Sequence, residues 1–167
     1  MTPNPKRRPL KRPPAALAVA LALLAASTVS WADDDGKRSP RVAPLPSYAR
    51  ECGACHVAFP VGLLPAQSWQ RLMANLPRHY GTDASLDAAT ANAIGVWLTA
   101  NAGSGKRASE APPEDRITRG SWFVREHREV SPQTWKLAAV KSPSNCAACH
   151  RSAEQGNYSE RDIAIPR

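Results

Sequence analysis

The spacing of apolar side chains predicts a helix near the middle of the chain. Apolar residues at positions 69, 72, 73 and 76 recur three and four positions apart, which places them on one face of an α-helix. Ser68 stands where an N-cap is expected, and Pro77 is expected to end the helix because proline disfavours the helical conformation in the residue before it. His79 then falls on the loop that follows.

A longer amphipathic stretch follows at residues 85–103. Its apolar residues form one helical face, with Ser85 as the expected N-cap and Gly103 as the expected stop. No stretch of the mature chain shows the β-branched alternation that is typical of a strand. We therefore predict a mostly α fold with long loops.

Shorter helical segments are predicted in the rest of the chain. Residues 47–56 fit one or two helical turns, and residues 117–130 fit a helix that carries His127. Residues 131–144 are expected to form a connecting loop. Residues 145–156 are expected to form a further helix, followed by a polar tail.

Breaks in this pattern divide the chain into five segments. Two of them are rich in proline and charge, which is typical of leaders and linkers. The predicted order is a signal segment at 1–32, a flexible leader at 33–46, a first unit at 47–101, a linker at 102–115 and a second unit at 116–167. Each unit has about sixty residues and few large aliphatic side chains, which is marginal for a bare polypeptide. A bound group is therefore expected to complete the core.

The N-terminus predicts export. A cationic stretch ends at Arg12, an apolar run extends from Ala15 to Ala26, and Ser30 and Ala32 are small residues of the kind that a signal peptidase reads. This apolar run is short for a membrane span. We therefore favour a cleaved signal peptide and a periplasmic mature chain over an uncleaved membrane anchor.

The charge balance changes once this segment is removed. The whole chain has 22 basic and 14 acidic side chains and a formal charge of +8. Five basic residues lie in the first twelve positions, so 17 basic and 14 acidic side chains remain, a net charge of +3. No basic stripe interleaved with aromatic residues appears later, so we expect no nucleic-acid partner.

All four cysteines lie in two copies of one hexapeptide, ECGACH at 51–56 and NCAACH at 145–150. Cys-x-x-Cys-His is the attachment signature of c-type haem. Two thiols three residues apart on a helical turn face the same way and reach the two vinyl groups of one porphyrin edge, and the adjacent histidine lies under the iron. The expected attachment residues are Cys52 and Cys55 with His56, and Cys146 and Cys149 with His150.

Three alternative roles for the cysteines fit the pattern less well. Redox disulfides need only Cys-x-x-Cys and leave both histidines without a role. Four-cysteine zinc sites usually separate their two pairs by about 15–20 residues, far less than the separation here. Structural disulfides do not favour a three-residue spacing. The repeated pattern in an exported chain favours two haem anchors.

Each haem iron needs a ligand on its second face, commonly methionine or histidine in electron-transfer proteins. The mature chain offers Met73, His79 and His127. Two spare histidines, one in each half, match two irons and favour bis-histidine ligation at both. We expect His79 on the first haem and His127 on the second, although a crossed pairing also satisfies the count. Met73 sits at core spacing on its helix, so packing explains it.

Several longer stretches give a more specific signal than the haem motifs. The order of a short helix, a haem motif, a helix, a loop ligand and a longer helix resembles a class I cytochrome c, with His79 in the place usually held by methionine. From about residue 48 to residue 166 the chain resembles the small dihaem cytochrome c family. The resemblance rests on the motifs and on LLPAQSWQRLM, RHYGTDASLD, RITRGSWFVREHRE and SPSNCAACHRSAEQGNYSERDI.

This resemblance implies a periplasmic, mostly helical protein with a class I cytochrome c-like first haem unit and a smaller second one. It also implies two covalently bound haem c groups and bis-histidine ligation at both. The implied partners are redox proteins, namely a monohaem, oxygen-binding high-spin cytochrome and a membrane cytochrome b donor, and the chain is expected to be a monomer.

The expected function is electron transfer without catalysis. Two alternatives stay open at this point. One is a haem enzyme or gas sensor with one open iron, which requires that His79 or His127 is not a ligand. The other is an electron-feeding subunit of a periplasmic reductase.

Overall fold

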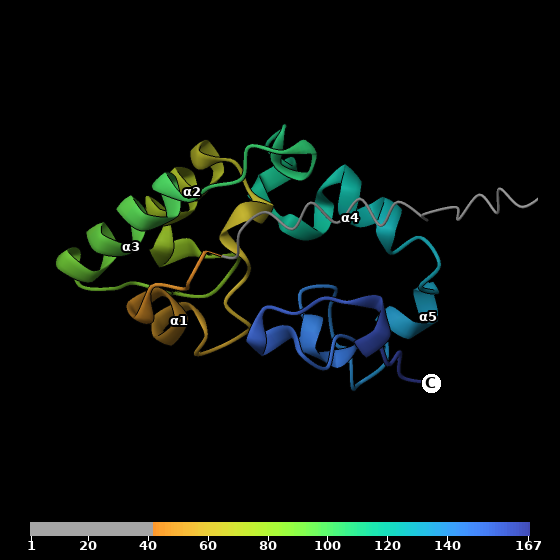
Figure 1. Cartoon of the computed structure of the whole chain (residues 1–167). Coiled ribbons are helices and arrows are strands. Elements are labelled where there is room, and N and C mark those ends of the chain that lie inside the picture. Colours follow the sequence, from red (N-terminus) through yellow and green to blue (C-terminus); the bar gives the residue numbers. More distant parts are fainter. Residues whose placement is uncertain (1–41) are drawn as a thin grey trace, which may run out of the picture. The chain divides into compact units, whose positions relative to one another are not determined.

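A computed structural model describes residues 42–167, and helices are the dominant regular structure in this part of the chain (Figure 1). Within it, β-structure is limited to two isolated antiparallel bridges, His79–Thr82 and His150–Ile163. The prediction of a mostly α fold with long loops is confirmed. The predicted signal segment at 1–32, and all of the leader before residue 42, lie outside the described residues.

The α-helices are short. They are α1 Pro46–Cys52, α2 Ala66–Met73, α3 Ala88–Ala100, α4 Ser121–Glu126 and α5 Pro132–Trp135. Eight 3₁₀ turns connect them: η1 Val61–Leu63, η2 Leu76–Arg78, η3 Lys106–Ala108, η4 Pro113–Asp115, η5 Ile117–Arg119, η6 Cys146–Ala148, η7 Ala153–Gln155 and η8 Glu160–Asp162.

Helix α2 begins earlier than predicted. Pro65 occupies the N-cap with an extended backbone, and its carbonyl accepts the first turn's hydrogen bonds, so Ser68 lies inside the helix and is fully buried. The predicted Ser68 cap is therefore wrong. The helix ends at Met73, and Pro77 sits in η2, where its missing N–H and fixed φ suit a first turn. His79 lies directly after η2, on a loop as predicted.

Helix α3 also has different ends from those predicted. The Asp87 carboxylate accepts a hydrogen bond from the Thr90 N–H at 2.9 Å and caps the helix, so the predicted Ser85 cap is wrong. The helix ends before Gly103, at Asn101. Gly103 is needed for close approach instead, because a Cβ there would lie 2.2 Å from the Gly62 carbonyl oxygen.

The apolar core lies in the first half of the described chain, where α2 packs against α3 (Figure 1). Ile94 and Leu98 of α3 are almost completely buried, and the Trp69 indole N–H donates to the Val61 carbonyl at 2.8 Å. The buried cluster is Tyr48, Val61, Leu64, Trp69, Ile94, Leu98 and Ile117. After residue 120 the buried apolar side chains are only Phe123, Val140 and Ala153. This shortage fits the expectation that a bound group completes the core.

Regular helix is scarcer in the second half than predicted. The helix expected over 117–130 is restricted to α4, and His127 is its C-cap. The helix expected over 145–156 does not form, and two 3₁₀ turns, η6 and η7, take its place. The reason is tertiary, because the backbone here pairs with the C-terminal tail: the Ala164 N–H donates to the Cys149 carbonyl at 2.8 Å.

The segment at 102–115, predicted as a linker, packs against the first half. Ala108 is buried, and Asp115 pairs with Arg71 of α2. Among the described residues, no helix has the length and the apolar character needed to cross a bilayer.

Replacing Ile94 with alanine tests the core assignment. Ile94→Ala leaves a cavity between α2 and α3 and is expected to lower the free energy of unfolding by about 2–5 kcal/mol. Urea unfolding followed by circular dichroism measures the change. The matched control is Val96→Ala on the same helix, where the side chain is 62% exposed and the expected effect is within about 0.5 kcal/mol. Equal effects of the two substitutions would contradict the packing described.

Candidate functional site

The first hexapeptide lies at the end of α1. The helix delivers Cys52 in its last turn, and Gly53 caps it with its N–H directed to the Ala49 carbonyl. A Cβ on Gly53 would lie 2.2 Å from that carbonyl oxygen, so glycine is required for the chain to turn here. Cys55 is exposed and Cys52 is partly buried, and neither is in a disulfide.

His56 and His79 face each other across the first site. Their ring centroids are 6.3 Å apart and the ring planes differ by only 21°. The Nδ1–H of His56 donates to the Val57 carbonyl at 2.7 Å, and the Phe59 ring stacks on the imidazole at 4.7 Å. A carbonyl only accepts, so this bond leaves Nε2 of His56 bare and able to bind a metal.

His79 is held by its backbone. It follows η2, and its carbonyl accepts the Thr82 N–H at 3.0 Å in a tight turn. Burial lowers the pKa of His79, and the nearby His56 and Arg116 lower it further. The imidazole is therefore neutral at pH 7, which is the form that binds metals.

The second hexapeptide lies in and after η6. Cys146 begins this turn, and the His150 N–H donates to the Cys146 carbonyl at 2.8 Å. Burial raises the pKa of the Cys52 and Cys146 thiols, each to about 11. The first cysteine of each motif is thus a neutral, partly buried thiol directed into the protein.

His127 and His150 face each other across the second site. Their ring centroids are 6.1 Å apart, and the ring planes differ by 74°. The Nδ1–H of His127 donates to the Phe123 carbonyl at 2.9 Å, and the Phe123 ring stacks on the imidazole at 3.9 Å. Burial lowers the pKa of His150, and His127 lowers it further, so His150 is also neutral at pH 7.

Each pair contains one histidine fixed by its own hydrogen bond and one that is not. Among the described residues, Nδ1 of His79 and Nδ1 of His150 are buried without a hydrogen-bond partner. A histidine whose Nδ1–H donates to a carbonyl is a more basic ligand with a defined ring orientation. In the first pair the fixed ring belongs to the hexapeptide, and in the second pair it belongs to α4.

The separation of the facing rings fits an iron between them. A metal–imidazole bond is about 2.0 Å long and the ring centre lies about 1.1 Å beyond the nitrogen, so two imidazoles on one iron have centroids about 6 Å apart. The observed separations are 6.3 and 6.1 Å. The structure brings together the predicted partners within each half, and Met73 packs against the core instead.

Several aromatic residues around the two sites were not predicted from the sequence. They stack on or contact a histidine and are Phe59, Tyr80, Phe123, Trp135 and Tyr158. Phe123 had a sequence signal, since it precedes His127 by four residues and side chains four apart on a helix are neighbours. The others come close only through tertiary folding.

The chain is similar to known proteins over most of the described residues. A family model described as dihaem cytochrome c matches residues 48–158. The crystal structure of DHC purified from Rhodobacter sphaeroides is 47% identical, with 70% of this chain and 99% of that chain covered and a TM-score of 0.61. The X-ray structure of the diheme cytochrome type c from Shewanella baltica OS155 is 36% identical. The match covers 72% of this chain and 91% of that chain, with a TM-score of 0.63. No curated protein matches the chain.

Proposed function

The chain belongs to the dihaem cytochrome c family, and from this premise we propose that it is a periplasmic electron carrier with two low-spin, bis-histidine irons. Family membership means that it carries two covalently bound haem c groups. When bound, each group supplies an iron that alternates between the ferric and ferrous states. The roles of individual residues of this chain are part of the proposal.

The observation that carries the proposal is the pair of imidazole separations, 6.3 Å in the first site and 6.1 Å in the second. Both match the span of two histidines on one iron. We assign covalent attachment to Cys52, Cys55, Cys146 and Cys149. We assign axial ligation to His56 with His79 and to His127 with His150.

The histidines give the sites their chemistry. Two axial imidazoles fill both faces of an iron, so no substrate reaches the metal and only electrons pass. Histidine on both faces favours a lower reduction potential than histidine with methionine. The Nδ1–H bonds of His56 and His127 strengthen this effect, because a more basic ligand stabilises the ferric state.

The location and partners follow from the sequence. The cationic and apolar pattern at 1–32 supports export to the periplasm, where c-type cytochromes of this kind typically work. The proposed partners are redox proteins, with a membrane cytochrome b as donor and a monohaem, oxygen-binding cytochrome as acceptor, and the carrier acts as a monomer. The net charge of +3 on the mature chain is offset by four haem propionates, so docking depends on local contacts more than on whole-molecule steering.

Carbon monoxide binding tests the ligation. In the dithionite-reduced, haem-loaded protein, both irons keep their histidines, so the spectrum recorded within minutes of CO addition is expected to show no change. His79→Ala and His127→Ala each open one iron, and each is expected to bind one equivalent of CO per protein. The CO difference spectrum gives the stoichiometry.

Met73→Leu is the matched control, because Met73 is the other possible sulfur or nitrogen ligand of the first half and packs in the core. It is expected to behave like the wild type. Rapid CO binding by one haem of the wild type would contradict the electron-carrier proposal and would favour a haem enzyme or gas sensor with an open iron.

The two sites are also expected to differ in their electron paramagnetic resonance spectra. Each imidazole donates π density to the iron d orbital perpendicular to its ring plane. Two near-parallel rings, at 21°, both raise the energy of the same iron d orbital, so this orbital and the second π-symmetry d orbital differ in energy. Two rings at 74° raise one d orbital each, so the two orbitals stay nearly equal in energy.

The oxidised protein should therefore give two low-spin signals. A rhombic signal with three resolved g values is expected from the first site, and a signal dominated by one large g value from the second. His79→Ala should remove only the rhombic signal, and His127→Ala only the other. Two identical signals would contradict the ring orientations.

A further inference from the structure

The four proposed axial ligands differ in what fixes their rings. His56 and His150 follow attachment cysteines directly in the sequence, and His127 donates its Nδ1–H to the Phe123 carbonyl. His79 has neither support: it follows no attachment cysteine, and its buried Nδ1 has no hydrogen-bond partner among the described residues. Its position must come from the loop that carries it.

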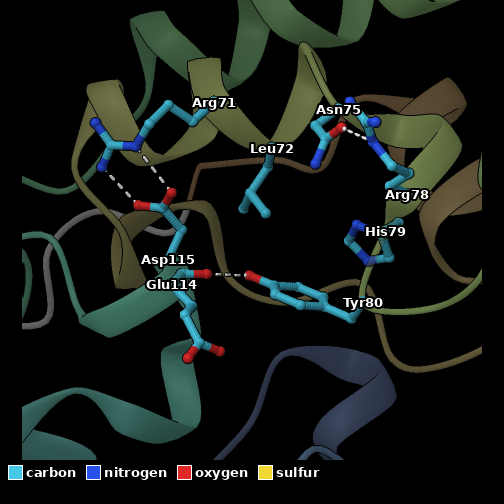
Figure 2. A pocket seen from close by; sticks show the side chains of 8 residues that line it. All are labelled: Arg71, Leu72, Asn75, Arg78, His79, Tyr80, Glu114 and Asp115. Atoms are coloured by element: carbon cyan, nitrogen blue, oxygen red, sulfur yellow. Dashed lines mark hydrogen bonds and ion pairs between the residues drawn. The ribbon is translucent and has the colours of Figure 1, made fainter.

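That loop is tied to residues 114–116, which we call the strap (Figure 2). The Tyr80 hydroxyl donates to the Glu114 carbonyl at 2.9 Å, and the Arg116 guanidinium lies 4.0 Å from the centre of the Tyr80 ring. On the other side of the strap, Asp115 accepts two hydrogen bonds from Arg71 of α2, at 2.8 and 2.6 Å. The strap therefore joins the residue next to His79 to the helix that precedes it.

The Arg71–Asp115 contact is a bidentate ion pair in which the Arg71 side chain is 54% exposed. Its two parallel hydrogen bonds match the planar guanidinium to the carboxylate, and the Asp115 side chain is only 13% exposed. The Arg71 hydrogen bonds also lower the pKa of the Asp115 carboxyl, which keeps it ionised at neutral pH.

Backbone strain is concentrated at the same contact. Tyr80 has φ 51°, and Glu114 and Asp115 each have φ 56°, a left-handed conformation that is unfavourable for residues other than glycine. Among the described residues only one other non-glycine position, Lys141, has a positive φ. Such conformations persist where the surrounding contacts impose them, and they gather at functional sites.

An open cleft lies beside His79. This cavity has a volume of about 240 Å³ and is lined by Arg71, Leu72, Asn75, Arg78, His79, Tyr80, Glu114 and Asp115. The first-site residues Cys52, Cys55 and His56 do not line this cavity. His79 thus has open space next to it that is separate from the attachment motif.

We propose that Tyr80, Asp115 and Arg71 are positioning residues that keep His79 on the iron of the first haem. This proposal rests on the bis-histidine ligation proposed above. The strap continues through η5 into α4, and His127 is the C-cap of that helix. One stretch of backbone therefore links the loop ligand of the first iron to the helix ligand of the second.

The test measures how often His79 leaves the iron. In the fully reduced, haem-loaded protein under saturating CO, slow CO uptake during long incubation is limited by dissociation of the axial histidine. Asp115→Asn removes the charge of the ion pair, and asparagine tolerates a left-handed backbone. Tyr80→Phe removes the hydrogen bond to Glu114 and keeps the ring.

Each variant is expected to speed CO uptake by the first haem by roughly threefold to tenfold, and the double variant by more. The CO spectrum of His79→Ala identifies the first haem. Arg71→Lys should lie nearer the wild type than Arg71→Gln, because lysine keeps the charge. The signal of the second haem should stay unchanged, which separates positioning from general loosening of the fold.

Asp83→Asn is the matched control. Asp83 lies in the same loop, and its carboxylate accepts a local hydrogen bond from the Ser85 N–H at 2.9 Å instead of pairing with the strap. It is expected to leave the uptake rate at the wild-type value. The positioning role would be overturned if Asp115→Asn and Tyr80→Phe took up CO at the same rate as Asp83→Asn. That result would leave the proposed bis-histidine ligation intact. CO binding by the wild-type first haem within minutes would instead overturn the ligation itself.

Discussion

A metal–imidazole bond is short and directional, so two histidines that share one iron must hold their rings across a gap of about 6 Å. In each half the facing histidines lie 23 positions apart in the sequence, and helices of four to thirteen residues joined by tight turns bring their rings to 6.3 and 6.1 Å. Under the proposed bis-histidine ligation, the irregular segments of the chain are what place these rings at the required separation.

The two halves differ in how much buried apolar surface surrounds the facing histidines. Most of the apolar core lies in the first half, where α2 packs on α3 and Cys52 packs against the buried cluster. The second half has few buried apolar side chains, and one of them, Phe123, stacks its ring on His127. A segment this small needs more buried apolar surface than its own side chains provide, and a covalently attached porphyrin supplies that surface. In the second half the cofactor is therefore part of the core as well as the redox centre.

The ligands are also fixed in different ways. In the second site the Phe123 carbonyl and ring contact His127, whereas in the first site the loop that carries His79 is tied through Tyr80 to the strap, which pairs with Arg71 of α2. The ring planes differ as well, near-parallel in one site and steeply inclined in the other. Under the proposed ligation the two irons therefore have chemically distinct surroundings.

Much of the chemistry was readable from local sequence. The repeated Cys-x-x-Cys-His signals haem attachment because reactivity depends on a few residues at fixed spacing, and that spacing is a local property. The count of spare histidines predicts His79 and His127 as the further ligands, and each ring lies about 6 Å from a histidine of a motif, while the ligation itself stays a prediction. A helix over this region was also predictable, since Ala88–Ala100 is rich in apolar residues, has no proline and places Ile94 and Leu98 at helical spacing.

Other features were decided only by tertiary structure. The segment after Cys146 has a sequence suited to a helix, yet it forms short 3₁₀ turns, and two backbone hydrogen bonds join it to the tail: the Arg151 N–H donates to the Asp162 carbonyl and the Ala164 N–H donates to the Cys149 carbonyl. The helix caps differ from the prediction for a local reason, because Pro65 and Asp87, within a few residues of the predicted serines, accept the hydrogen bonds of the first turns. The angle between facing rings and the contact of Tyr80 with Glu114 have no counterpart in the sequence pattern. They join residues tens of positions apart, and only the packing of the folded chain determines where those residues meet.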